Sequence, residues 1–159
     1  MGLFDFSLTT RWLIPASVDK VWCCLVATES WPTWWQYVAL VEETAEGAAS
    51  GVDNNRRYIW RTCLPYALAI DLRVTKIQPY HFIAVEVTGD LIGNGSCSIT
   101  YLEKEAQTEL IFIWNVALAK PWMKLLAGLA RPLFVWNHQR VMKKGEQGLI
   151  RHLIGSWAS

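Results

Sequence analysis

The chain ends in the sequence PWMKLLAGLARPLFVWNHQRVMKKGEQGLIRHL, which covers Pro121–Leu153 and predicts one long helix. Beyond Pro132, apolar residues recur at spacings of three and four, so they fall on one helix face. This face holds Phe134, His138, Val141, Gly145 and Leu149, with Met142 and Gly148 at its sides. Glycine is a poor helix former, so two glycines here indicate a close approach to the rest of the protein, or room for a ligand. Pro132 is expected to kink or split the helix, because proline cannot donate an interior helical hydrogen bond.

Six strand-like segments precede this helix. They are Val38–Glu43, Arg57–Thr62, Ala67–Ile77, Phe82–Gly89, Ile92–Glu103 and Thr108–Leu118. Most of their connections are short, which favours antiparallel pairing over parallel strands with crossover helices. The segment Thr44–Asn55 is small, polar and without periodicity, so it predicts an exposed loop. Such a loop is either a lid over a binding site or a plain connection.

The chain starts with one more strand-like segment and two short helices. Phe6–Ile14 alternates apolar and polar residues, as a strand does. Ser17 is expected to cap a helix through Val26, and Pro32 lies in the first turn of a second helix around Trp31–Tyr37. The order of elements predicts a curved antiparallel sheet that is closed by one C-terminal helix, with a cavity between them.

Alternation along the strands predicts which side chains face this cavity. Combined with the apolar face of the helix, it gives a set of expected ligand-binding residues. They are Tyr58, Trp60, Leu72, Val85, Cys97, Phe112, Trp114, Phe134, Asn137, His138, Val141 and Met142. Flat aromatic walls suit an apolar or aromatic ligand, although ordinary core packing explains the same pattern. Glu86 is expected to point outward.

Composition and charge restrict the partners. The 159 residues are 52% apolar and 18% charged, with a net charge of +1, which argues against a nucleic-acid partner. The ten tryptophans exceed what a core of this size needs, so some are expected in a pocket or interface. Residues 120–159 hold seven basic residues and one acidic residue. This basic helix either contacts an anionic membrane surface or is a solvated face. Ile111 and Ile113 face outward, which leaves both a monomer and a homodimer open.

No motif for a metal, a cofactor or a phosphate is present, so neither a metal nor a cofactor is expected. The four cysteines lack zinc-site spacing, and we expect reduced, mostly buried thiols in a cytoplasmic protein. The most apolar stretch, Trp122–Trp136, is too short and too charged to span a bilayer.

His138 is the strongest candidate for acid–base chemistry, because burial on the apolar helix face would tune its pKa. The plain alternative is a buried histidine that is satisfied by one hydrogen bond. Asn137 and Arg140 could orient a ligand carbonyl or hydroxyl together with His138. Alternatively, Arg140 is only solvated.

Several segments are similar to those of one known group of proteins. They are Trp31–Trp35, Arg57–Arg61, Lys120–Met123, Ala130–Pro132 and Trp136–His138. They resemble bacterial members of the SRPBCC superfamily, the START-like proteins of the polyketide cyclase/dehydrase and lipid-transport type. The resemblance covers nearly the whole chain and implies one START-like domain over residues 1–159. Its fold would be the helix-grip fold of the α+β class, in which a seven-stranded antiparallel sheet wraps around a long C-terminal helix. Two short helices would lie between strands 1 and 2. In the resembling fold the cluster of Trp31, Trp34 and Trp35 would lie near a pocket mouth, although the same tryptophans could simply pin the second helix.

This fold hosts several functions, so the resemblance alone does not choose among them. We expect binding or transport of a hydrophobic small molecule, such as a lipid, polyketide, isoprenoid or aromatic metabolite. The enzyme alternative is a polyketide cyclase, aromatase or dehydratase that uses His138 as acid and base. A third reading is an interaction module that uses Ile111 and Ile113 or the basic helix.

Overall fold

Every strand-like segment of the sequence forms a strand, and the seven strands pair into one antiparallel sheet in the order β1-β7-β6-β5-β4-β3-β2. The computed structural model describes residues 5–155, except for the side chains of Asp5 and residues 126–130. The strands are β1 (Asp5–Ile14), β2 (Val38–Ala45), β3 (Asn55–Trp60), β4 (Leu68–Gln78), β5 (Phe82–Gly89), β6 (Leu91–Leu102) and β7 (Gln107–Leu118). The helices are α1 (Val18–Val26), the short 3-10 helix η1 (Thr28–Ser30), α2 (Trp31–Trp34) and α3 (Pro121–Gly155).

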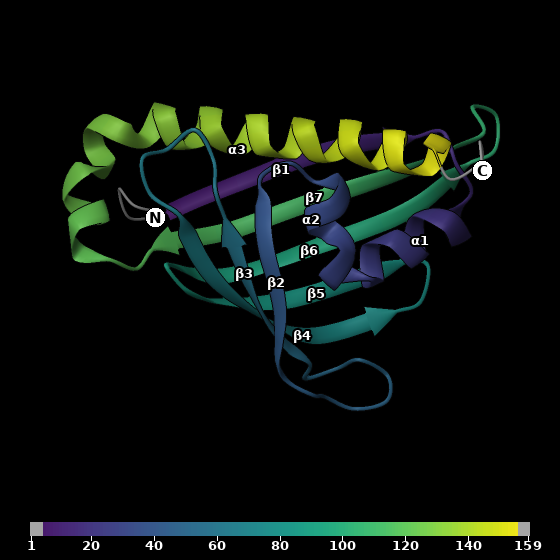
Figure 1. Cartoon of the computed structure of the whole chain (residues 1–159), viewed down its shortest axis with the longest axis horizontal. Coiled ribbons are helices and arrows are strands. Elements are labelled where there is room, and N and C mark those ends of the chain that lie inside the picture. The colour runs from purple at the N-terminus through teal and green to yellow at the C-terminus, as the bar shows by residue number, and fades with distance from the viewer. Residues whose placement is uncertain (1–4, 156–159) are drawn as a thin grey trace.

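The helices cover one side of this curved sheet. Figure 1 shows α3 running along β1 and β7, with α2 against α3, while α1 contacts β6 and η1. The predicted α+β helix-grip fold, with a long C-terminal helix and short helices between the first two strands, is therefore confirmed. The interior lies between the inner face of the sheet and these helices.

The second short helix ends earlier than predicted. α2 stops at Trp34, and Trp35 takes an extended conformation with φ −104° and ψ 101°. The reason is a long-range bond, because Trp35 Nε1 donates to the carbonyl oxygen of Val141 in α3 at 2.9 Å. The prediction of a helix through Tyr37 was wrong because this bond to α3 is invisible in the local sequence.

The predicted loop Thr44–Asn55 is shorter in the structure. β2 continues through Ala45, which pairs with Asn55 at the start of β3. The remaining loop, residues 46–54, is anchored on β4, since Asp53 N donates to Val74 O and Val74 N donates to Asn54 O. It therefore has fewer free residues than the composition suggested.

α3 is continuous through Pro132 and is not split. Its N-terminal part bends away from the axis of the remainder (Figure 1), as expected from a proline inside a helix. The predicted kink is thus present. Within residues 5–155, no helix, α3 included, is long and apolar enough to cross a membrane.

The outer face of the sheet carries ion pairs. Arg57 forms a two-pronged pair with Asp71 at 2.9 and 3.0 Å, and Arg73 contacts both Asp53 and Glu86. The outward position of Glu86 agrees with the alternation of β5. All four cysteines are unpaired in the structure, but Cys23 and Cys63 are exposed. The expectation of mostly buried thiols was therefore wrong for these two.

Two glycines set the distance between α3 and the tryptophans. A Cβ atom on Gly145 would lie 2.4 Å from Trp35 Cε2, and one on Gly148 would lie 1.9 Å from the carbonyl oxygen of Trp34. Real Cβ contacts do not come so close, so α3 can pack here only because both residues lack a side chain. Of the two reasons offered for these glycines, the close approach holds, and tryptophans fill the space beside Gly145.

We expect Gly148→Ala to destabilise the protein. In an unhindered helix this change stabilises by about 1 kcal/mol. Here the new methyl group meets backbone, so α2 and α3 must separate, and we expect a net loss of about 2 kcal/mol. Urea denaturation followed by circular dichroism measures the change. Gly155→Ala is the control, because a Cβ atom there has no neighbour within 4 Å. Equal stability of the two variants would contradict the described contact.

Candidate functional site

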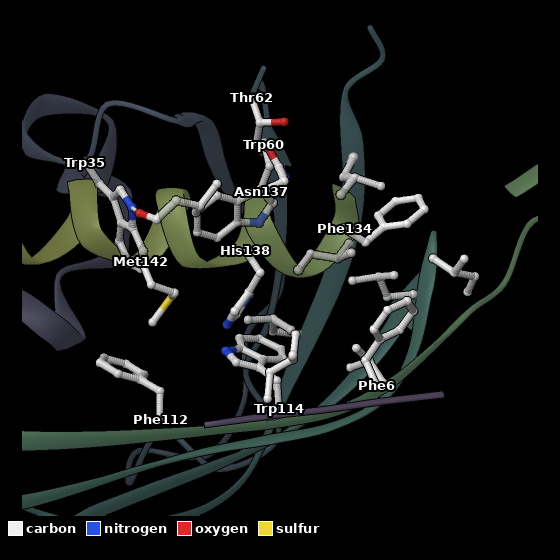
Figure 2. Close-up of a pocket in the computed structure, with 18 of the residues that line it drawn as sticks. Phe6, Trp35, Trp60, Thr62, Phe112, Trp114, Phe134, Asn137, His138 and Met142 are labelled. Atoms are coloured by element: carbon white, nitrogen blue, oxygen red, sulfur yellow. Dashed lines mark hydrogen bonds between the residues drawn. The ribbon is translucent and has the colours of Figure 1, made fainter. Parts of the chain in front are cut away.

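A cavity of about 150 Å³ lies between α3 and the inner face of the sheet. Figure 2 shows Phe134, His138 and Met142 projecting from α3, with Phe112 and Trp114 facing them from β7. Most of its wall is hydrocarbon or aromatic ring. Such a wall removes apolar surface from water and gives little to a charged molecule.

Nine of the twelve predicted ligand-binding residues line this cavity. They are Trp60, Leu72, Phe112, Trp114, Phe134, Asn137, His138, Val141 and Met142. The other three, Tyr58, Val85 and Cys97, line a second cavity instead. The structure thus places all twelve on the interior, but in two spaces rather than one. Contact between these residues and a ligand stays a prediction.

The second cavity encloses about 420 Å³ between the inner face of the sheet, α1, η1 and the loop of residues 46–54. Ser50 and Asn54 of the loop belong to its wall. The loop is therefore a wall of the second cavity, and it does not line the first. Its opening as a lid stays a prediction.

His138 is held in an apolar setting beside β1. Its Nε2 lies 3.5 Å from Thr10 Oγ1, and burial lowers the pKa of His138 to about 4. Burial has this direction because it disfavours the charged imidazolium. The side chain is therefore neutral at pH 7, where one ring nitrogen donates and the other accepts a hydrogen bond.

Asn137 gives the first cavity a buried hydrogen-bond acceptor. The residue is only 6% exposed, and its Oδ1 has no hydrogen-bond partner in the described part of the chain. Trp60 Nε1 is likewise buried without a partner there. A buried donor or acceptor without a partner costs about 1–3 kcal/mol, so the Trp60 N–H and the Asn137 oxygen favour a ligand that pairs with them.

Arg140 does not join Asn137 and His138. Its Nε donates to Tyr37 Oη at 2.9 Å, and its guanidinium lies 5.6 Å from the centre of the Trp136 ring. The arginine is exposed and lies outside the wall of either cavity. The structure therefore does not bring Arg140 together with His138, because the helix turns by about 200° between these two residues and they lie on opposite sides of α3.

The tryptophans of the α2 region both pack and line the site. Trp35 lies 5.1 Å from the ring of Trp12 and 5.1 Å from that of Trp60, and it also lines the first cavity with Trp31. The sequence left open whether these tryptophans lie near a pocket mouth or pin the helix, and it did not include Trp35 in the expected ligand-binding set. It also missed Phe6, although the alternation of β1 carried the signal.

Acidic and metal-binding groups do not converge in this interior. Within the described residues, no three His, Cys, Asp or Glu side chains gather as metal ligands would. Neither cavity has an Asp or Glu from that part of the chain in its wall. The arrangement can exclude water, hold an apolar molecule and offer a few neutral hydrogen bonds.

Comparisons at the level of sequence found no relative. No protein-family model matches the chain, and no curated protein does. Solved structures, in contrast, match over nearly the whole chain. The Zhui aromatase/cyclase from Streptomyces sp. R1128 has a TM-score of 0.75 at 17% identity and covers 93% of each chain.

Two further structures agree with this match. A START superfamily protein from Mycobacterium smegmatis has a TM-score of 0.70 at 15% identity, with 94% of this chain and 96% of that chain covered. The di-domain ARO/CYC BexL from the BE-7585A biosynthetic pathway has a TM-score of 0.74 at 16% identity. It is matched over 95% of this chain but 50% of its own length. At these identities the likeness establishes the fold, and the chain has the START-like fold of aromatase/cyclases.

Proposed function

We propose that this protein binds or transports a hydrophobic small molecule in the cavity between the sheet and α3. The ligand class is a lipid, polyketide, isoprenoid or aromatic metabolite. The observation that carries the proposal is a cavity with walls of hydrocarbon and aromatic rings, in which Asn137 and His138 are neutral polar groups. Apolar burial at about 25 cal/mol per Å² would supply most of the affinity.

The unpaired Oδ1 of Asn137 narrows this class. A ligand hydroxyl or N–H that donates to it would remove the cost of a buried, unsatisfied acceptor. The ligand is therefore an apolar molecule with at least one donor group. Among the residues that the structure describes, no positively charged side chain lines the first cavity, so a carboxylate would be unpaired there.

A cyclase- or aromatase-type enzyme is the second candidate, and the fold shared with named aromatase/cyclases favours it. In that case His138 would move a proton. Its low pKa opposes this role, because the imidazole is neutral at pH 7 and is a weak base. The same property suits a residue that only hydrogen-bonds to a neutral ligand.

Native mass spectrometry of the purified protein, followed by denaturing extraction, tests the proposal. A co-purified lipid or aromatic metabolite is the expected result, and it would identify the ligand class. Protein that stays empty, and that gains no mass when incubated with extracts rich in apolar metabolites, would contradict a carrier role.

His138→Ala separates the two candidates. For a carrier, we expect the affinity for the extracted ligand to fall by less than about tenfold, since one neutral hydrogen bond is lost. Isothermal titration calorimetry measures this, with His152→Ala as a control on the same helix. If His138→Ala instead leaves binding intact and abolishes conversion of the ligand to a new product, the enzyme candidate replaces the carrier.

The stability of the protein should depend on pH through His138. The unfolded imidazole takes up a proton near pH 6.5, whereas the folded one does so near pH 4. Unfolding therefore becomes easier as the pH falls from 6.5 towards 4. Relative to His138→Gln, the wild type should lose on the order of 2 kcal/mol between pH 7 and pH 4.5. A parallel pH dependence of the two proteins in urea titrations would show that His138 titrates as an exposed histidine.

Peripheral membrane contact is supported by exposed apolar residues on the N-terminal half of α3. Leu125 is 85% exposed, and Trp122, Leu133 and Trp136 are also exposed large apolar side chains. Lys124 is exposed beside them. Aromatic and aliphatic groups flanked by lysine are typical of helices that lie at an anionic membrane surface.

We expect the protein to co-sediment with vesicles of phosphatidylcholine and phosphatidylglycerol, and less with phosphatidylcholine alone. Leu125→Glu should reduce binding at least fivefold, because a carboxylate cannot enter the bilayer interface. Ile154→Glu, at the exposed far end of the same helix, is the matched control. Identical binding by the two variants would place the contact elsewhere or exclude it.

A further inference from the structure

The first cavity is small for the ligands considered above. It encloses about 150 Å³, whereas pockets for drug-sized ligands enclose about 300–1,000 Å³. The second cavity encloses about 420 Å³, and the function proposed above does not use it. The first cavity alone falls below that range, the second falls within it, and the two together offer the most room for a polyketide or lipid with both of its ends.

Side chains, rather than a strand or helix, separate the two cavities. Trp31, Leu72, Phe112 and Trp114 line both of them. Trp114 stands over Gly95, its cross-strand partner, where an added Cβ would lie 3.1 Å from two atoms of the indole ring. Rotation of these side chains would join the cavities while the backbone of the sheet stays in place.

A residue in the wall of the second cavity, Asn54, also carries a buried acceptor without a donor. Asn54 is 7% exposed, and its Nδ2 donates to Glu43 Oε2 at 2.7 Å. Because this bond to a carboxylate fixes the orientation of the amide, the other atom is the acceptor Oδ1. Asn54 Oδ1 has no partner among the described residues, as is true of Asn137 Oδ1 in the first cavity.

Charge in the second cavity is already compensated. Arg56, the charged residue of its wall, contacts Glu29 at 2.7 Å and Glu43 at 3.3 Å. Tyr58 adds a buried phenol, and burial raises its pKa to about 12, so it stays neutral. A neutral ligand end therefore suits this space better than a charged one.

We propose that the second cavity is the far compartment of the ligand site, and that it receives one end of an elongated, uncharged molecule with a hydroxyl or N–H near each end. One donor group pairs with Asn137 and the other with Asn54. The inference rests on the function proposed above and narrows its ligand class. It also gives a role to the four residues that line both cavities, Trp31, Leu72, Phe112 and Trp114. Their side chains move aside only for a ligand that is long enough to enter both cavities.

A series of α,ω-alkanediols of increasing length, with matched 1-alkanols, tests this on the intact protein. Calorimetry should show affinity rising about fourfold per added methylene, beyond the length that the first cavity alone can hold. A short diol should bind more weakly than its alkanol, since its second hydroxyl is desolvated without a partner. A long diol should bind more tightly than its alkanol, and Asn54→Leu should remove this preference.

Variants that fill one cavity separate the inference from the proposed function. Val85 lines only the second cavity. In Val85→Phe, affinity should therefore stop increasing with diol length at a shorter chain than in the wild type, while the shortest diols bind equally well. Cys97→Met adds volume to the same cavity and serves if Val85→Phe does not fold. Leu8 lines only the first cavity, so Leu8→Phe should weaken the binding of every diol.

The outcomes are distinct. If wild type, Val85→Phe and Cys97→Met share one dependence on chain length, the second cavity is no part of the site and the inference is overturned, while the proposed function stands. If Asn54→Leu keeps the preference for long diols, the hydrogen bond to Asn54 is excluded. If the wild type binds no member of either series, the proposed function fails as well.

Discussion

α3 packs against Trp34 and Trp35 at a distance that only glycine allows on the helix. The rest of the interior depends on this contact. Gly145 and Gly148 remove the atoms that would hold helix and tryptophans apart. The Nε1 of Trp35 then reaches the carbonyl oxygen of Val141 on α3. The hydrogen bond and the close packing occur at the same place. They therefore set the distance between α3 and the sheet, and with it the positions of the site residues on α3.

The two faces of the sheet carry different kinds of side chain. Ion pairs of Arg57 and Arg73 lie on the outer face, where water screens them and each contributes little to stability. Neutral aromatic and aliphatic groups face the helices. Among the described residues, no charged side chain lines the first cavity, and Arg56 in the wall of the second is paired with Glu29 and Glu43. An interior of this kind selects ligands by shape and by a few hydrogen bonds, and so it suits the carrier candidate.

Alternation and helical periodicity predicted a curved antiparallel sheet closed by one C-terminal helix, and they placed Trp60, Trp114 and Asn137 on the wall of one cavity. The seven-stranded helix-grip fold was implied by the resemblance to the SRPBCC superfamily. Alternation and periodicity are local patterns, and every strand obeys them until a bulge intervenes. One lies between Val74 and Lys76 of β4, and beyond it Ile77 lines the second cavity. The end of α2 and the division of the interior into two cavities depend on tertiary contacts and side-chain rotamers, which no local pattern encodes.

The distribution of tryptophans gives the protein a built-in optical label. Indoles in apolar surroundings emit at shorter wavelengths than indoles in water, and the two groups here are separated in space. Trp31, Trp35, Trp60 and Trp114 face the cavities, whereas Trp122 and Trp136 are exposed on α3. Iodide in the solvent would quench the long-wavelength part of the emission, while an occupant of the interior would alter the short-wavelength part. Events at the helix surface and inside the sheet can therefore be followed separately in one unlabelled sample.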